Sequence, residues 1–392
     1  MNKLARAYNI ADLSAMARRR LPAGLYEYIA RGAEDEVTLQ ANTESIKRVF
    51  IRRRVGVDVS SRDLSTTLFG VKQSMPLGIA VTGLAALFSY NGERSLARAA
   101  ATAGIPFMIG SANFTSQAEL KPICGDLLWR QIYPPKRRDL LDHHLLLTRS
   151  AGIRVLVVTM DSPMVGNREY NRRNGWGGKG GPGARSLPQM LRAPHWLFGT
   201  LLRYLVNGGL PEIADMPPGE RKYYKGSRSF ADLAEDFTWD ELRALRRRWD
   251  DVLVVKGILT AEDATLAAEC GVDGIIVSSH GGRSLDGCVP SFDALPEILD
   301  AVAPKVTVMV DSGFSRGSDI LKAIAMGASA VLVGRATLYG LAAGGEAGVA
   351  RALEIFREEI DRSLAQFGAP SLRELNRNHL CWPAHGSSGA RV

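Results

Sequence analysis

Short apolar runs recur along the chain from residue 77 onward, and longer helical patterns separate most of them. The runs predict eight buried strands, at Leu77–Val81, Ile105–Ile109, Leu127–Ile132, Val155–Val158, Val252–Val255, Ile275–Val277, Val306–Val310 and Ala330–Val333. The helical patterns cover residues 93–103, 116–122, 137–151, 239–249, 261–270, 292–302 and 318–326. Eight strand-and-helix units over about 250 residues predict an α/β fold, the (β/α)8 or TIM barrel. A doubly wound sheet is the alternative, but it normally stops at about five or six strands.

The rest of the chain predicts additions to one barrel domain. Residues 11–31 predict an N-terminal segment of two short helices, and residues 345–366 predict a helix with acidic and basic faces. The interval 171–237, between the fourth and fifth strands, is too long for a simple crossover and is therefore an insert. We expect the domain to span residues 1–378 and the glycine- and serine-containing end, 379–392, to be a flexible tail.

The insert combines a glycine-rich loop with a short aromatic segment. The loop, Gly175–Gly183, suits a lid over the barrel mouth. Residues 194–206 carry Trp, Phe and Leu side chains beside Arg192 and Arg203, a composition suited to a bilayer interface. A small covered core or a subunit contact is the alternative, and the pattern favours neither over the membrane.

Composition narrows the class of protein. A chain of 392 residues with 46% hydrophobic content can bury a large core. Its net charge of +8 comes from short basic runs, which suit solvated faces, an anionic membrane surface or an anionic substrate. No aromatic interleaving or zinc-ligand spacing accompanies the runs, so we expect no nucleic acid and no metal. Isolated cysteines and the lack of an apolar run of about 18 residues favour a cytoplasmic protein, or one held peripherally at the inner face of a membrane.

Polar side chains follow almost every predicted strand. They are Thr82, Ser111, Gln131 with Tyr133, Thr159 with Asp161, Lys256, Ser278 with His280, Asp311 with Gly313, and Gly334 with Arg335. In a barrel all eight strands end on one face, where the active site lies. Because packing alone does not explain such a set, we predict that these residues share one site.

The stretch Gly274–Asp286 places a histidine just after the end of a predicted apolar strand. Gly281 and Gly282 let the backbone turn sharply behind His280 and approach a flat ligand closely. Arg283 follows three residues after the histidine, so a base and a fixed cation can face one cavity. An ordinary glycine-rich loop with a solvent-facing histidine is the alternative. Surface positions are expected for four other histidines, His143, His144, His379 and His385.

Three further features suggest a flavin. Gly334 and Arg335, with Asp311–Gly313 after the preceding strand, suit the phosphate corner of a barrel. Lys256 ends an apolar strand and would be a costly buried charge without a partner, which a reduced anionic flavin would supply. The chain has no Gly-x-Gly-x-x-Gly strand-turn-helix, which argues against a nicotinamide dinucleotide.

These residues resemble the FMN-dependent α-hydroxy-acid dehydrogenases and oxidases, which include glycolate oxidase, lactate dehydrogenase and, most similar, mandelate dehydrogenase. The resemblance covers nearly the whole chain and is carried by Gly32–Asp35, Gln131–Tyr133, Thr159–Pro163, Val255–Gly257, Ser278–Arg283, Asp311–Gly313 and Gly334–Tyr339. It implies that His280 takes a proton from the substrate carbon or hydroxyl, with Asp161 paired to it. It also implies that Tyr133 bonds the substrate oxygen and that Lys256 stabilises the reduced flavin. The substrate carboxylate would be held by Tyr28, Arg168 and Arg283.

The resemblance also assigns the cofactor contacts. The isoalloxazine and ribityl groups would be contacted by Thr82, Ser111, Gln131, Thr159, Lys256 and Ser278, and the ribityl and phosphate end by Asp311, Gly313, Gly334 and Arg335. The sequence departs from the family in four places: Val81 replaces a proline, Gly110 a serine, Ser315 the first of two arginines near the phosphate, leaving Arg316, and Ser279 an asparagine.

Substrate and acceptor follow from the same resemblance. Gly83 and Ala112 stand where members acting on small hydroxy acids carry bulkier residues, which favours an aromatic L-2-hydroxy acid such as mandelate, with lactate as the alternative. The insert resembles the membrane-binding segment of the dehydrogenases, which pass electrons to a quinone or another carrier. An oxidase that uses dioxygen, and a barrel that only binds a membrane surface or another protein, are the alternatives. The resemblance further implies a homo-oligomer, a tetramer.

Overall fold

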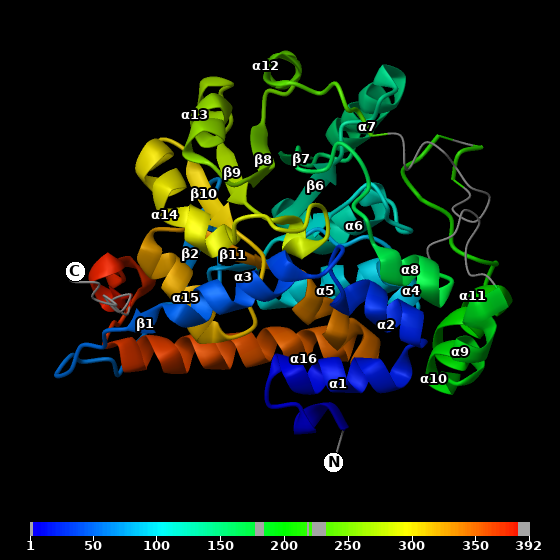
Figure 1. Cartoon of the computed structure of the whole chain (residues 1–392), viewed down its shortest axis with the longest axis horizontal. Helices are drawn as coiled ribbons and strands as arrows, with labels where there is room; N and C mark the ends of the chain where they lie inside the picture. The colour runs from blue at the N-terminus through cyan, green and yellow to red at the C-terminus, as the bar shows by residue number, and fades with distance from the viewer. Residues whose placement is uncertain (1–2, 177–183, 218, 222–232, 383–392) are drawn as a thin grey trace, which may run out of the picture.

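Eight parallel strands close into a barrel at the centre of the molecule (Figure 1). The computed structural model describes residues 3–176, 184–217, 219–221 and 233–382. Neighbouring strands follow the order β10, β11, β4, β5, β6, β7, β8, β9, with bounds β4 Leu77–Ile79, β5 Phe107–Ile109, β6 Leu128–Ile132, β7 Val155–Thr159, β8 Val252–Ile258, β9 Gly274–Val277, β10 Thr307–Val310 and β11 Ala330–Val333. Each predicted apolar run overlaps one barrel strand, so the predicted (β/α)8 class is confirmed.

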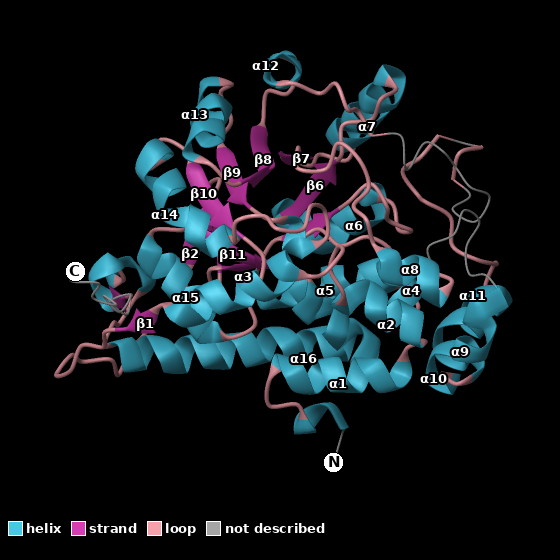
Figure 2. Ribbon diagram, viewed as in Figure 1, coloured by secondary structure: helices cyan, strands magenta, loops and turns pink. Residues whose placement is uncertain are grey.

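Helices surround the barrel strands (Figure 2). The helices that follow the strands are α4 Ala85–Phe88, α5 Gly92–Ala103, α6 Gln117–Cys124, α7 Arg138–Ser150, α12 Trp239–Arg246, α13 Ala261–Glu269, α14 Ser291–Val302, α15 Gly317–Met326 and α16 Arg335–Phe367. The seven helices predicted between strands are all present, with ends within three residues of the predicted ones.

Helix α16, Arg335–Phe367, consists of two helical parts that meet at a kink. The kink lies at Gly344 and Gly345, whose backbone angles are not helical. The helix predicted over residues 345–366 matches the second part, whereas the first part, which starts at Arg335, was not predicted. Arg335 therefore occupies the first turn of α16, at the open end of the barrel.

Apolar side chains fill the barrel interior, and a hairpin closes one end. Trp129, Met108, Val157 and Ile276 belong to a separate buried cluster inside the strands. The hairpin β2 Thr66–Leu68 and β3 Val71–Gln73 places Phe69 against Trp129, with ring centroids 5.6 Å apart. A Cβ on Gly274, the first residue of β9, would lie 2.8 Å from the Phe69 ring, so the hairpin covers the amino ends of the strands. The polar residues at the carboxyl ends face the other way.

Three N-terminal helices support that polar face. The two predicted helices are present as α1 Ile10–Arg20 and α2 Ala23–Ala30, and α1 packs along α16 (Figure 1). A third helix, α3 Val37–Arg48, was not predicted. Its first turn is capped by Asp286, whose Oδ1 accepts from the Thr38 amide at 2.8 Å, and its Asn42 Oδ1 accepts from Ser279 Oγ at 3.0 Å. Helix α3 thus fixes the loop that carries His280.

Outside the insert, the remaining described elements are short: η1 Lys3–Arg6, β1 Phe50–Ile51, η2 Gly125–Leu127, η7 His280–Gly282, η8 Leu372–Glu374, η9 Arg377–His379 and β12 Leu380–Cys381. Strand β12 pairs antiparallel with β1, and the buried His379 lies 6.2 Å from Phe367 between ring centroids. Residues 379–381 of the expected tail therefore belong to η9 and β12, and the surface position expected for His379 was wrong. Residues 383–392 lie outside the described part.

The insert folds into a series of short helices beside the barrel (Figure 1): α8 Glu169–Asn174, η3 Ala184–Ser186, α9 Leu187–Leu191, α10 Pro194–Trp196, the π-helical η4 Leu197–Leu202 and α11 Arg203–Val206. One face is buried through Ala193, Trp196 and Thr200. The same segment exposes several large apolar side chains, which are Leu187, Leu191, Phe198, Leu202, Leu205, Val206 and Leu210. Most of the predicted lid, residues 177–183, lies outside the described residues. No described helix is long and apolar enough to cross a bilayer.

A buried arginine on β6 joins the insert to the barrel. Arg130 NH1 donates to the Gly110 carbonyl at 2.8 Å and forms an ion pair of 3.1 Å with Asp215 of the insert, and both side chains are almost fully buried. Arg130 NH2 lies 3.4 Å from Nδ1 of His144, which is also buried. The surface position expected for His144 was wrong, because α7 turns this residue toward Arg130. Burial, and then the Arg130 charge, lower the pKa of His144 to about 3.

We predict that His144 makes the fold less stable in mild acid. Its pKa is lowered in the folded chain and is about 6.5 in the unfolded chain, so only the unfolded state takes up a proton as the pH falls. The contribution of His144 to the free energy of unfolding is complete above about pH 6.5 and is lost as the pH falls toward 3. At pH 5 the loss is about 2 kcal/mol. His144→Gln, which keeps an acceptor for Arg130, should reduce the fall in the free energy of unfolding between about pH 7.5 and pH 5, measured with urea. The same change at the exposed His195 should leave the fall intact, and equal falls in wild type and His144→Gln would contradict the prediction.

Candidate active site

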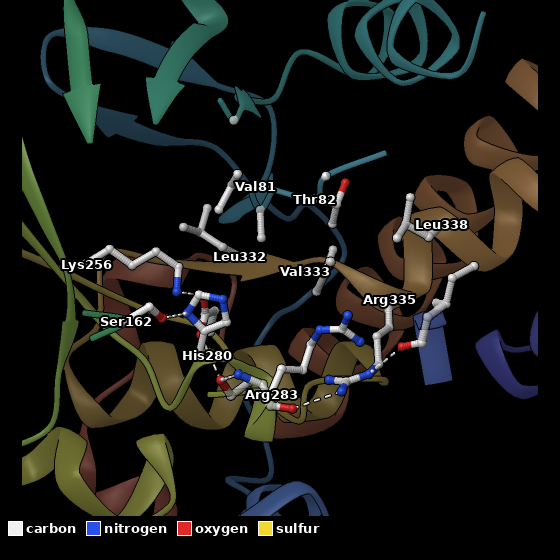
Figure 3. A pocket seen from close by; sticks show the side chains of 18 of the residues that line it. Val81, Thr82, Ser162, Lys256, His280, Arg283, Leu332, Val333, Arg335 and Leu338 are labelled. Carbon is white, nitrogen blue, oxygen red and sulfur yellow. Dashed lines mark hydrogen bonds and ion pairs between the residues drawn. The ribbon is translucent and has the colours of Figure 1, made fainter. Parts of the chain in front are cut away.

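A cavity of about 390 Å³ opens at the carboxyl ends of the barrel strands (Figure 3). The predicted site residues that line it are Tyr28, Thr82, Gly83, Ser111, Ala112, Gln131, Tyr133, Arg168, Lys256, His280, Arg283, Asp311, Gly313, Gly334 and Arg335. The other three predicted residues stand behind the lining. Thr159 Oγ1 accepts from Gln131 Nε2 at 2.8 Å, Ser278 Oγ lies 2.5 Å from Lys256 Nζ, and Asp161 contacts His280.

His280 stands at the end of β9 in a backbone conformation that is uncommon for a residue with a side chain. Its φ is 56°, and its amide donates to Ser278 Oγ at 3.0 Å. Its Nδ1 lies 2.8 Å from Asp161 Oδ1, and its Nε2 lies 3.2 Å from the Tyr133 hydroxyl. With Asp161 ionised, the neutral imidazole carries its proton on Nδ1 and turns the free Nε2 lone pair toward Tyr133, which lines the cavity.

Asp161 is a buried carboxylate that stays ionised. Burial opposes its charge, but attraction to His280 and Lys256 and the bond from His280 bring its pKa down to about 2. Space for it depends on Gly257, where a Cβ would fall 2.4 Å from that of Asp161 and where φ is 107°. Burial, and then the Asp161 charge, raise the pKa of Tyr133, so its phenol stays neutral and can donate a hydrogen bond.

Lys256 has a partner within the protein. Its Nζ lies 3.1 Å from Asp311 Oδ2 and 2.5 Å from Ser278 Oγ, and the lysine is buried. The expectation that a cofactor alone would balance this charge was wrong, because Asp311, which directly follows β10, two strands further along the barrel, already does so. Asp311 is itself held by Ser312, whose hydroxyl donates to Asp311 Oδ1 at 2.8 Å.

Three guanidinium groups line the cavity (Figure 3 labels Arg283 and Arg335). Arg283 NH1 donates to the carbonyls of Tyr28 and Arg31, and its guanidinium carbon lies 4.8 Å from the centre of the Tyr28 ring. Arg168 Nε donates to the Arg283 carbonyl at 3.1 Å. Burial, and then repulsion from Arg283, lower the pKa of Arg168 and bring that of Arg335 to about 10. Such a concentration of positive charge suits anionic ligands.

The predicted phosphate corner is built largely from backbone. Gly313 has a φ of 91°, and a Cβ there would lie 2.6 Å from the Asn42 carbonyl, so only glycine fits. Ser315 lines the cavity, whereas Arg316 points away and pairs with Glu359 at 2.6 Å. The expectation that Arg316 remains near the phosphate was therefore wrong, and Arg335 is the cation that lines this end.

The model of the FMN-dependent dehydrogenase family matches residues 17–382 of the chain. The chain belongs to this family. Its cofactor is FMN, and the fit can be tested on the cavity wall. Thr82 Oγ1, Ser111 Oγ and Gln131 Oε1 are buried and have no hydrogen-bond partner among the described residues. Buried polar atoms normally have partners, and a flavin ring with its ribityl chain presents donors and acceptors for them. The residues therefore fit FMN, and Arg335 is a cation that lines the end of the cavity where the sequence predicts the phosphate.

Similar proteins in this family are dehydrogenases and oxidases. An L-lactate dehydrogenase of Pseudomonas putida (strain GB-1) is 38% identical over 371 residues, which cover 94% of this chain and 97% of that one. The structure of a monotopic membrane protein, (S)-mandelate dehydrogenase, matches with a TM-score of 0.90 and 36% identity, covering 96% of this chain and 100% of that one. A mandelate oxidase with (S)-4-hydroxymandelic acid matches with a TM-score of 0.82 and 32% identity, covering 96% and 98%.

Several lining residues were not predicted from the sequence, including Ser162, Met164, Val165 and Leu233. Ser162 directly follows Asp161, so its place after a strand end was an available signal. Leu233 comes from the end of the insert and reaches the cavity through its pairing with Pro135. That contact depends on how the insert folds back.

Proposed function

We propose that this FMN-dependent dehydrogenase oxidises an L-2-hydroxy acid to the 2-oxo acid and prefers an aromatic substrate such as mandelate. The observation that carries the proposal is the position of His280, whose Nε2 faces Tyr133 in a cavity that Arg168 and Arg283 also line. A base beside two guanidinium groups suits a substrate with an acidic oxygen or carbon next to a carboxylate. FMN, when bound, accepts the two electrons of the oxidation.

Each residue of the site has a role in the reaction that follows from its charge. Arg168 and Arg283, with Tyr28, bind the substrate carboxylate and set the hydroxyl-bearing carbon near His280. The neutral Tyr133 phenol donates to the substrate oxygen. His280 Nε2 takes the proton from the substrate carbon or its hydroxyl, and the imidazolium is stabilised by Asp161, whose carboxylate lies 2.8 Å from Nδ1. Lys256, steadied by Asp311, supplies positive charge beside the cofactor.

Substrate size follows from the small residues of the wall. Gly83 presents no side chain, and a Cβ on it would just touch Ala112 Cβ at 3.4 Å. Met164, Val165 and Leu233 add apolar surface to the same cavity. Space and apolar lining together favour a phenyl or long-chain substituent over the methyl group of lactate.

The exposed apolar face of α9 to α11 favours a membrane-linked electron acceptor. Large apolar side chains gathered on one surface mark an interaction site, and the exposed Arg192 and Arg203 suit anionic headgroups. One similar structure is that of a monotopic membrane protein. We infer peripheral membrane association and transfer of electrons to a quinone or another carrier.

His280→Ala should retain FMN and lose catalysis. Without the base, anaerobic reduction of the flavin by mandelate should be about a thousandfold slower. The rate is measured from the flavin absorbance in a stopped-flow experiment. The control is His195→Ala, at an exposed histidine of the insert, which should match wild type. If the flavin of His280→Ala is reduced as fast as that of the wild type, His280 is not the base. If none of the 2-hydroxy acids tested reduces the wild-type flavin, the proposed function is refuted. Stoichiometric peroxide formation in air would make the protein an oxidase.

Gly83→Ala should shift selectivity toward small substrates. The added methyl takes space from the substrate, so the ratio of kcat/KM for mandelate to that for lactate should fall about tenfold. Gly199→Ala is the matched control, because a Cβ there meets nothing within 4 Å. A ratio that is unchanged, or that changes equally in both variants, would contradict the assignment of Gly83 to the substrate wall.

Phe198→Glu with Leu205→Glu should weaken vesicle binding. Both side chains are exposed, and carboxylates there remove apolar contact and repel anionic lipid, so the partition coefficient should fall at least about tenfold. Sedimentation with phosphatidylglycerol and phosphatidylcholine vesicles measures it. Val55→Glu is the control, because Val55 is exposed and follows β1, which Figure 1 draws on the opposite side of the molecule from α9 to α11. Unchanged sedimentation of the double variant would remove this surface from the membrane contact.

A further inference from the structure

The hydroxyl of Ser162 touches both members of the pair formed by His280 and Asp161. Ser162 follows β7 directly after Asp161 and lines the cavity. Its Oγ lies 2.8 Å from Asp161 Oδ1 and 3.2 Å from His280 Nδ1. Figure 3 shows Ser162 beside the imidazole ring. None of the roles assigned above uses this hydroxyl.

The direction of each bond follows from counting protons. Ser284 Oγ lies 3.2 Å from Ser162 Oγ, but it donates its own proton to the Asp161 carbonyl at 3.0 Å. Ser162 also has one proton, and its nearest acceptor is the ionised Oδ1 of Asp161. The Ser162 lone pairs are then free to face the N–H of His280 Nδ1. That proton is shared between Asp161 Oδ1 and Ser162 Oγ, as a three-centre bond.

Asp161 needs this second contact because only one of its side-chain oxygens is held. Oδ2 is buried and has no hydrogen-bond partner among the described residues. It lies against Gly257, where a Cβ would be 2.7 Å from it. The final torsion of an aspartate is broad, so a carboxylate bound only by His280 could turn about its Cβ–Cγ bond. The Ser162 hydroxyl holds Oδ1 from a second direction.

The His280 ring has a similar requirement. Its backbone is fixed by the bonds from the His280 amide to Ser278 Oγ and from the Gly281 amide to Ser312 Oγ, both 3.0 Å. On the Nε2 side, the Tyr133 hydroxyl is the one hydrogen-bond partner of the ring within the part of the chain that the structure describes. In the proposed reaction that hydroxyl turns to the substrate. The Nδ1 side, with Asp161 and Ser162, must then keep Nε2 aimed at the substrate proton.

We propose that Ser162 is a positioning residue for proton transfer, which holds the Asp161 carboxylate and the Nδ1 edge of His280 so that Nε2 faces the substrate. The proposal deepens the function given above and rests on His280 as its base. Its consequence is a slower chemical step with unchanged substrate affinity when the hydroxyl is removed, since Ser162 does not hold the substrate carboxylate.

The kinetic test compares Ser162→Ala, Ser162→Thr and Ser284→Ala, all loaded with FMN. Anaerobic flavin reduction by mandelate should be about tenfold slower in Ser162→Ala, with the Kd for mandelate within about twofold, because one hydrogen bond of about 1.4 kcal/mol is lost. The α-deuterium isotope effect should rise in the same variant. Ser162→Thr keeps the hydroxyl and should recover most of the rate. The Ser284 hydroxyl contacts Ser162 and the Asp161 carbonyl and has no hydrogen bond to His280 among the described residues, so Ser284→Ala should behave as wild type.

A second readout does not depend on turnover. In FMN-loaded protein with 15N-labelled histidine, the signal of the His280 Nδ1 proton is assigned by its absence in His280→Ala. This proton should exchange with water about tenfold faster in Ser162→Ala than in wild type, and at the wild-type rate in Ser284→Ala. Equal exchange in wild type and Ser162→Ala, or an equal loss of rate in Ser284→Ala, would overturn the proposal. If no 2-hydroxy acid reduces the wild-type flavin, the proposed function fails, and the exchange rates still decide the role of Ser162.

Discussion

The closure of eight parallel strands into one barrel is the constraint on which the site depends. Parallel strands all end on the same face, so residues far apart in the chain are brought to one cavity. β7 ends before Asp161, β8 carries Lys256, and β9 ends before His280. The register between strands places Thr159 opposite Lys256 and Val310 opposite Val277. A shift of one residue in the register of a strand would turn its last side chains to the other face, and the residues of the site would no longer meet in one cavity.

Charge pairing then decides what the cavity binds. Asp311 and Lys256 are opposite charges 3.1 Å apart, and the Asp161 carboxylate lies 2.8 Å from Nδ1 of His280, which donates a proton to it, so each buried carboxylate has a partner. The guanidinium groups of the cavity are different. They donate to backbone carbonyls, and burial and mutual repulsion lower the pKa of Arg168 and Arg335. An anion in the cavity relieves that cost, which is why a phosphate-bearing cofactor and a carboxylate substrate suit it together.

The sequence predicted the barrel and most of the cavity wall because both depend on local signals. Apolar runs of β-branched residues mark strands, and polar residues directly after them mark the catalytic face. The prediction failed where an outcome depends on contacts between distant segments. Lys256 looked unpaired until β10 brought Asp311 beside it, and His144 looked exposed until Arg130 and the insert covered it. Helix α3 was missed because its mixed sequence, Val37–Arg48, shows little apolar periodicity and is held through Asp286 and Ser279.

The central claim is that one cavity orients a 2-hydroxy acid by its carboxylate and presents the reacting carbon to His280. A crystal structure of the FMN-loaded protein with the 2-oxo acid derived from mandelate tests it most directly. The account predicts the carboxylate within about 3 Å of Arg168 and Arg283, the ketone oxygen near Tyr133 and Nε2 of His280, and the phenyl ring beside Gly83 and Ala112. An acid bound elsewhere, or bound with its carboxylate turned away from both arginines, would contradict it.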